Sequence, residues 1–114
     1  MSNKPQIKTD ALYQLLRTGD IEAFNQRKAA GEVCDLTGCD FRGLDLRGMD
    51  TAGLDLSDGY FRQTDLRAVD LRAAQMAGAS IHGAMISGAY FPNELSSDEI
   101  YLSLAHGTRM RYGC

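Results

Sequence analysis

The sequence predicts an all-β solenoid between two helical caps, and three observations lead to this fold class. Residues 34–93 divide into twelve consecutive five-residue blocks without an insertion, so this part of the chain repeats with a constant period. Eleven of the twelve third positions are large and apolar, and seven of the twelve fifth positions are glycine. The segments on both sides of the blocks carry helix-start and helix-stop signals instead.

The five-residue period fits neither a helix, which repeats every ~3.6 residues, nor a plain strand, in which side chains simply alternate. Within a block, the first and third side chains point to one side and the second and fourth to the other, as in a strand. Glycine at the fifth position suits a sharp corner, because it has no Cβ to clash at unusual dihedral angles. Repeated strands and corners therefore give a closed coil with the first and third positions inside. The predicted solenoid core comprises the apolar third-position residues: Leu36, Phe41, Leu46, Leu56, Phe61, Leu66, Leu71, Met76, Ile81, Ile86 and Phe91.

Three further residues of the repeat carry specific expectations. Thr51 is the one polar third-position residue, so we expect a packing fault in its block. Cys34 and Cys39 occupy first positions and are expected to be buried thiols rather than zinc ligands, since the sequence has no Cys-x-x-Cys motif. With three cysteines in all and a cytoplasmic location expected, we predict no structural disulfide.

The blocks, such as LDLRG at residues 44–48 and VDLRA at residues 69–73, resemble the pentapeptide-repeat family, whose pattern is A-(D/N)-L-x-x. The resemblance covers 60 of the 114 residues in one unbroken register. It implies a right-handed quadrilateral β-helix with four blocks in each coil, and hence about three coils. The predicted organisation is an N-terminal helical cap at residues 1–33, the β-helix at residues 34–93, and a C-terminal capping helix with a short basic tail at residues 94–114.

Two short helices are predicted in the N-terminal cap. The first spans residues 9–17, where three leucines recur at helical spacing. Gly19 fits the position just after its end, and Asp20 fits the N-cap of a second helix. That helix is expected over residues 20–30 and stops at Gly31.

One helix is predicted in the C-terminal cap. Ser96 is its N-cap, Glu99 is placed to reach back in a capping box, and the helix ends before Gly107. Its apolar residues cover an arc of about 200°, which is wider than one buried face needs. We therefore expect one flank to cover the last coil and the other to form a homodimer interface. The candidate interface residues are Tyr101, Leu102 and Ala105.

With four blocks in each coil, residues twenty apart stack on one outward face. On the second face, Arg42, Arg62 and His82 form such a column. Stacked like charges repel unless something neutralises them, so the column is a candidate site for an anion or a partner. The competing interpretation is a solvated surface of Asp–Arg pairs, each worth ~0–1 kcal/mol. The candidate partner face consists of Arg42, Arg62, His82 and Tyr60.

The sequence offers no catalytic, cofactor-binding or metal-binding motif, and a core filled by side chains leaves no pocket of enzymatic size. We therefore predict a protein that is not an enzyme and has no cofactor. A net charge of −3 gives no basic surface for direct nucleic-acid binding. No apolar run reaches the ~18 residues of a membrane span and the polar start lacks a signal sequence, so we expect a cytoplasmic protein without membrane contact.

Three functions remain open. The first is a non-catalytic protein-interaction or scaffold module with an unknown partner, which a rigid repeat without chemistry favours. The second follows from the resemblance, because quinolone-resistance pentapeptide proteins imitate DNA and modulate DNA gyrase and related topoisomerases. Residues 34–93 hold eight Asp but also five Arg, which weakens that interpretation. The third is a regulatory protein whose partner binds the caps, above all the last helix and the basic tail.

Overall fold

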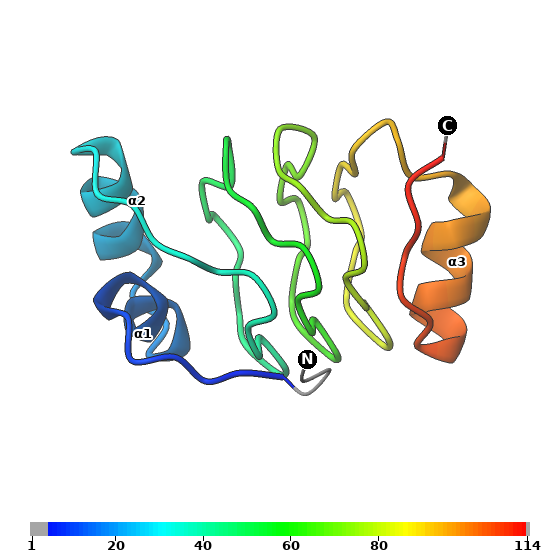
Figure 1. The fold of residues 1–114 in the computed structure, drawn as a ribbon, viewed down its shortest axis with the longest axis horizontal. Helices are drawn as coiled ribbons and strands as arrows, with labels where there is room; N and C mark the ends of the chain where they lie inside the picture. The colour runs from blue at the N-terminus through cyan, green and yellow to red at the C-terminus, as the bar shows by residue number, and fades with distance from the viewer. Residues whose placement is uncertain (1–4, 114) are drawn as a thin grey trace.

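The computed structural model describes residues 5–113 as a coiled central repeat between helical ends (Figure 1). Helices α1 (Ala11–Arg17) and α2 (Ile21–Ala29) pack together at one end of the repeat. Helix α3 (Ser97–His106) and the tail that follows it lie at the other end. Helices therefore flank the repeat on both sides, as the flanking sequences predict.

The repeat winds with four blocks in each turn. Parallel bridges join residues twenty apart, such as Asp40 to Tyr60 and Asp45 to Asp65. Backbone hydrogen bonds tie each coil to the next; Phe41 N, for example, donates to Tyr60 O at 2.8 Å. The contacts are isolated bridges between short extended stretches, so the described residues form a β-helix without long continuous strands. The spacing of the bridges agrees with the coil that the sequence predicts.

Third-position side chains fill the inside of the coil. Nine of the eleven predicted core residues, those from Leu36 to Ile81, are at most 1% exposed. The last two, Ile86 and Phe91, are only half-buried. The sequence therefore overestimates the burial of these two residues. At the end of the repeat, burial depends on the cap because no further coil follows.

An aromatic column runs through the first half of this core. The rings of Phe41 and Phe61 stack one coil apart, with centroids 4.7 Å apart and an angle of 15° between the planes. Tyr13 of α1 meets Phe41 edge-on at 5.8 Å. Its hydroxyl donates to Asp40 O at 2.6 Å. The column thus docks α1 onto the first coil through both apolar and polar contacts.

The sequence predicts a packing fault at Thr51; an open hollow of about 340 Å³ does border its block, but the Thr51 side chain itself is buried and paired. The residue is 2% exposed, and its hydroxyl donates to Asp70 O at 2.7 Å. Thr64, a first-position residue, likewise donates to Phe41 O at 2.6 Å. A buried hydroxyl with a hydrogen-bond partner fits an apolar core at little cost. The core of this repeat therefore tolerates a small polar side chain beside a backbone carbonyl of a neighbouring coil.

The corners of the coil lie in the left-handed region of the backbone. The seven fifth-position glycines have φ between 66° and 83°. Three corners of the middle coil use other residues in the same conformation: Asp58 (φ 59°), Gln63 (57°) and Ala68 (61°). A Cβ is unfavourable there, so these three corners are strained where a glycine would not be.

Before α1, a single β-bridge that the sequence did not indicate joins the chain to the first coil. Gln6 forms a parallel bridge with Cys39, and its N–H donates to Gly38 O at 3.0 Å. Helix α1 then starts two residues later than predicted, because Asp10 is the N-cap and accepts from Leu12 N at 2.9 Å. The bridged residue and the helix together cover the start of the first coil.

Helix α2 is capped by Asp20 as predicted, through Ala23 N at 3.1 Å. One side chain docks this helix on the coil. The Asn25 amide donates to Gly48 O and accepts from Asp50 N, both at 2.9 Å. Two backbone groups at the edge of the first coil are thereby satisfied by a helix rather than by a strand.

The C-terminal cap is held by a contact that differs from the predicted capping box. Ser96 accepts from Glu99 N at 3.2 Å, which is half of that motif. The Glu99 carboxylate instead accepts from Arg111 N at 2.8 Å and from the Arg111 guanidinium at 3.1 Å. In the tail the carboxylate thus gains both a backbone N–H and a charged guanidinium, in place of the single backbone N–H of the capping box.

The tail itself pairs with the first half of the last coil. Met110 is fully buried; its carbonyl accepts from Gly78 N at 2.7 Å and its N–H donates to Ala79 O at 2.9 Å. The Tyr112 hydroxyl accepts from Met76 N at 2.7 Å. The predicted basic tail is therefore an ordered part of the cap, packed between the last coil and solvent.

Candidate functional site

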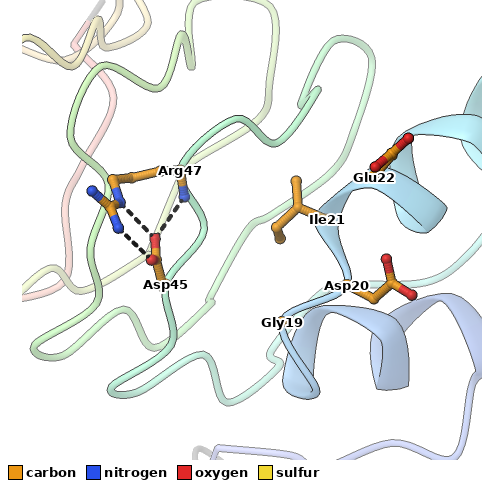
Figure 2. Close-up of a pocket in the computed structure, with 6 residues that line it drawn as sticks. All are labelled: Gly19, Asp20, Ile21, Glu22, Asp45 and Arg47. Atoms are coloured by element: carbon orange, nitrogen blue, oxygen red, sulfur yellow. Dashed lines mark hydrogen bonds and ion pairs between the residues drawn. The ribbon is translucent and has the colours of Figure 1, made fainter.

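The outward Asp side chains hold the corners of the repeat. Each second-position Asp accepts a hydrogen bond from the backbone N–H two residues later, as Asp45 does from Arg47 at 3.1 Å. Where that later residue is arginine, its guanidinium folds back onto the same carboxylate. Arg47 Nε and Nη2 lie 2.9 and 2.7 Å from Asp45 (Figure 2). The same contacts occur in the pairs Asp40–Arg42, Asp65–Arg67 and Asp70–Arg72.

These arginine contacts lower the pKa of the carboxyl groups. Hydrogen bonds from Arg67 lower the pKa of Asp65 from 3.8 to about 2. Hydrogen bonds from Arg72 do the same to the pKa of Asp70. A second guanidinium, that of Arg47, reaches Asp65 from the neighbouring coil at 3.3 Å. The carboxylates therefore stay ionised, but a neighbouring cation offsets the charge they present outward.

The candidate partner face is only partly a column of free cations. Arg42 Nε and Nη2 each lie 2.9 Å from the carboxylate of Asp40, which is 6% exposed. The repulsion in the column is thus relieved within the protein. Arg62 is exposed and makes no ion pair or side-chain hydrogen bond among residues 5–113.

The other two residues of that face lie against the C-terminal cap. The ring of His82 packs on Gly107, and His82 Nδ1 is buried without a hydrogen-bond partner in the described part of the chain. Arg109 of the tail lies over the Tyr60 ring, with its Cζ 5.1 Å from the centroid, and donates to the Tyr60 hydroxyl. Of the four residues named from the sequence, the structure therefore leaves Arg42 and Arg62 outside the cap.

The outer flank of α3 is placed as the sequence predicts. Tyr101 is 63% exposed and Leu102 is 38% exposed, and Ala105 lies on the same exposed side. Ile100 and Leu104 pack against the core instead. This flank is the apolar surface that a homodimer would use.

An open groove lies between the start of α2 and the first coil (Figure 2). It has a volume of about 580 Å³. Asp45 and Arg47 form its wall on the coil side, where they bind each other, and Ile21 projects from the helix side. The lining residues are Gly19, Asp20, Ile21, Glu22, Asp45 and Arg47. The one cation in the groove is already bound, so we assign no chemistry to it.

The two thiols of the repeat differ in burial. Cys39 is fully buried as predicted, and burial raises the pKa of its thiol to about 11. Cys34, which the sequence also predicts to be buried, is only half-buried, and that burial raises the pKa of its thiol. Both are free cysteines. No three His, Cys, Asp or Glu side chains among residues 5–113 gather in a way that could hold a metal ion.

The contacts of the tail are the part of the surface that sequence reasoning missed. In residues 109–112, Arg109 and Arg111 alternate with Met110 and Tyr112. The two arginines bind Tyr60 and Glu99, while the other two contact the last coil. Such alternation is the strand-like signal from which a closing segment could have been predicted.

Comparison with known families gives one result. A family model described as pentapeptide repeats, in eight copies, matches residues 34–72 and again residues 55–91. The two matches together span residues 34–91, just over half of the chain. Comparison with curated proteins and with solved structures finds no match. Within the described residues, every helix is too short or too polar to cross a membrane.

Proposed function

Because the chain belongs to the pentapeptide-repeat family, we propose that it is a non-catalytic interaction module whose β-helix presents outward faces to a protein partner. We also propose the right-handed, quadrilateral form of about three coils that the family implies, in a cytoplasmic protein. The observation that supports this function is that the outward Asp carboxylates are hydrogen-bonded within the repeat itself. All seven second-position Asp side chains accept backbone hydrogen bonds from their own corners, so they serve the fold first.

A partner can therefore recognise this surface mainly through its shape and its exposed apolar side chains. Four of the six exposed large apolar side chains of the described residues lie toward the C-terminal end of the coil, Met85 (45%), Tyr90 (56%), Tyr101 (63%) and Leu102 (38%), and the other two, Ile7 (60%) and Val33 (91%), lie before the repeat. Tyr90 is also flanked by the Arg72 guanidinium, 4.5 Å from its ring centroid. Aromatic side chains beside arginine are common at protein interfaces. We therefore expect the partner to engage this end rather than the charged middle.

The pairing of the second-position carboxylates weighs against the alternative of DNA mimicry. A DNA mimic needs uncompensated negative charge along its length. Here six of the seven second-position carboxylates lie within 3.3 Å of a Lys or Arg nitrogen, and the exception is Asp55. Gyrase inhibition therefore has no support in the arrangement of charges.

We further propose a homodimer through the outer flank of α3. Tyr101, Leu102 and Ala105 form one self-complementary patch, as a two-fold interface requires. The support is their exposure on a helix whose other side already covers the coil.

The interaction module is tested by co-purification with surface variants. Tagged wild type, Met85→Glu, Tyr90→Glu and Val33→Glu are expressed in the native cells and isolated under mild conditions. We expect a stoichiometric protein partner with the wild type and its loss with Met85→Glu or Tyr90→Glu. Val33→Glu, at a 91% exposed apolar residue at the other end of the repeat, is the matched control and should keep the partner. If no protein co-purifies stoichiometrically with the wild type, the proposed function is wrong.

A further inference from the structure

The last coil is covered unevenly by its cap. On one half of it, the third-position residues Met76 and Ile81 are fully buried. On the other half, Ile86 and Phe91 are half-buried, although their equivalents one coil earlier are at most 1% exposed. Apolar core is thus open to solvent along residues 84–91, which we call the open edge.

The backbone of the open edge is also unpaired. One coil earlier, Leu66 N donates to Met85 O at 2.8 Å and Leu71 N donates to Tyr90 O at 2.7 Å. The equivalent groups of the last coil are Ile86 N, Gly88 N and Phe91 N, together with the carbonyls of Ala84 and Ala89. None of these five makes a hydrogen bond with the described residues.

The covered half of the same coil shows what satisfies such an edge. Gly78 N donates to Met110 O, and Met110 N donates to Ala79 O, so an extended residue of the tail pairs there like the next coil. Gly83 N donates to Leu104 O at 3.0 Å at the other covered position. The tail is extended at this point and inserts an apolar side chain. An extended segment is therefore the form of chain that the open edge fits.

We propose that the open edge binds an extended segment of the partner protein by β-pairing, which rests on the proposed interaction module. The partner carbonyls accept from Ile86 N and Phe91 N, and its N–H groups donate to Ala84 O and Ala89 O. Two apolar side chains of the partner, five residues apart, cover Ile86 and Phe91. Main-chain hydrogen bonds then supply affinity, and the two apolar positions supply selectivity.

A second copy of this chain fits the edge less well. In a head-to-tail stack, the open edge would meet the free edge of the first coil, but α2 already covers the second half of that edge. Asn25 binds both Gly48 O and Asp50 N there. The proposed dimer flank, around Leu102 of α3, uses none of the open-edge backbone groups.

The test uses a synthetic peptide with the sequence of residues 64–73, TDLRAVDLRA, acetylated and amidated at its ends. Its two leucines have the five-residue spacing that covers Ile86 and Phe91. Its two aspartate N–H groups are placed to donate to Ala84 O and Ala89 O, as Met85 N and Tyr90 N do one coil earlier. The matched control is the same peptide methylated on those two backbone nitrogens, which removes the donors and keeps the side chains.

Binding is followed by amide NMR and hydrogen exchange of the intact protein. We expect shifts and slower exchange at Ile86, Gly88 and Phe91, and about tenfold weaker binding of the methylated peptide. Equal binding of both peptides, or no perturbation at millimolar peptide, would overturn the proposal. Slow exchange of these amides in the free protein that is lost on dilution would instead assign the edge to a second copy, and the proposal would be wrong.

A variant pair separates this proposal from the proposed function. Ile86→Glu places a charge on the edge, and Ile7→Glu makes the same change at an exposed site at the other end of the chain. Circular dichroism first establishes that both variants keep the fold. Peptide binding should weaken about tenfold in the first and stay unchanged in the second. A native partner that still co-purifies with folded Ile86→Glu contradicts the open edge but leaves the interaction module standing.

Discussion

The ring of Phe61 occupies the space that a side chain at Gly59 would need. A Cβ at Gly59 would lie 2.7 Å from Phe61 Cε2 and 3.0 Å from Leu56 O. Gly59 is the only glycine among the first positions of the twelve blocks. In the orientation that the Phe61 ring adopts, only glycine therefore fits at position 59.

Gly59→Ala should destabilise the protein by about 1–3 kcal/mol, because overpacking displaces the stacked ring of Phe61. Urea denaturation followed by circular dichroism measures the change in free energy of unfolding. Gly113→Ala is the matched control, since its Cβ would meet nothing closer than 3.5 Å. Equal stability of Gly59→Ala and wild type would mean that Phe61 is not packed as described.

Ala68→Gly should stabilise the protein by about 0.5–1 kcal/mol, because Ala68 is held at a φ of 61° and glycine relieves that strain. Thermal denaturation measures this change in the free energy of unfolding. Ala73→Gly is the control; Ala73 is also a fifth-position residue but is not in the left-handed region. We expect that substitution to destabilise through the greater flexibility of the unfolded chain. The same sign at both positions would contradict the strained corner.

Stability should fall as the pH drops from about 4 to about 2. The pKa of Asp65 and that of Asp70 are near 2 in the folded protein and near 3.8 when free. The folded state thus binds fewer protons than the unfolded state across this interval, so acid favours unfolding. Denaturation midpoints at stepwise pH measure the slope. Asp70→Asn keeps the oxygen that binds Arg72 N but cannot titrate, and it should reduce the slope; an unchanged slope would assign the acid sensitivity elsewhere.

Leu102→Glu should convert a dimer into a monomer, because a burial-driven interface does not accept an unpaired charge. Sedimentation of the wild type at tens of micromolar should give twice the 12.5 kDa chain mass. Val33→Glu, at a 91% exposed residue outside α3, is the control and should leave the dimer intact. A monomeric wild type would contradict the proposed dimer and would mean that the apolar flank of α3 stays exposed in solution.

The periodic part of the molecule could be read from the sequence, and the aperiodic part could not. The family and the four-block coil are confirmed, because every block repeats the same inward and outward pattern. The capping residues Asp20 and Ser96 could also be recognised, since a cap is a local signal. The pairing of Gln6 with Cys39 is a single long-range contact without a period, so no local pattern announces it.

The candidate sites were harder to predict for the same reason. The exposure of Tyr101 and Leu102 followed from helical periodicity alone. Arg109 of the tail lies over the Tyr60 ring, and the repeat pattern does not predict the position of the tail. Likewise, the half-burial of Phe91 depends on how far the cap extends. The partner, the dimer and the cytoplasmic location stay predictions.

The central claim is that the repeat uses its carboxylates internally and binds a partner without imitating DNA. A gyrase supercoiling assay tests it most directly, with the wild type and an Arg47→Gln, Arg67→Gln, Arg72→Gln variant that releases the paired carboxylates. We predict no inhibition by the wild type at tens of micromolar, and any inhibition only in the variant. Submicromolar inhibition by the wild type would contradict the claim, and Asp35, Asp45, Asp50, Asp55, Asp65 and Asp70 would then be the carboxylates to examine.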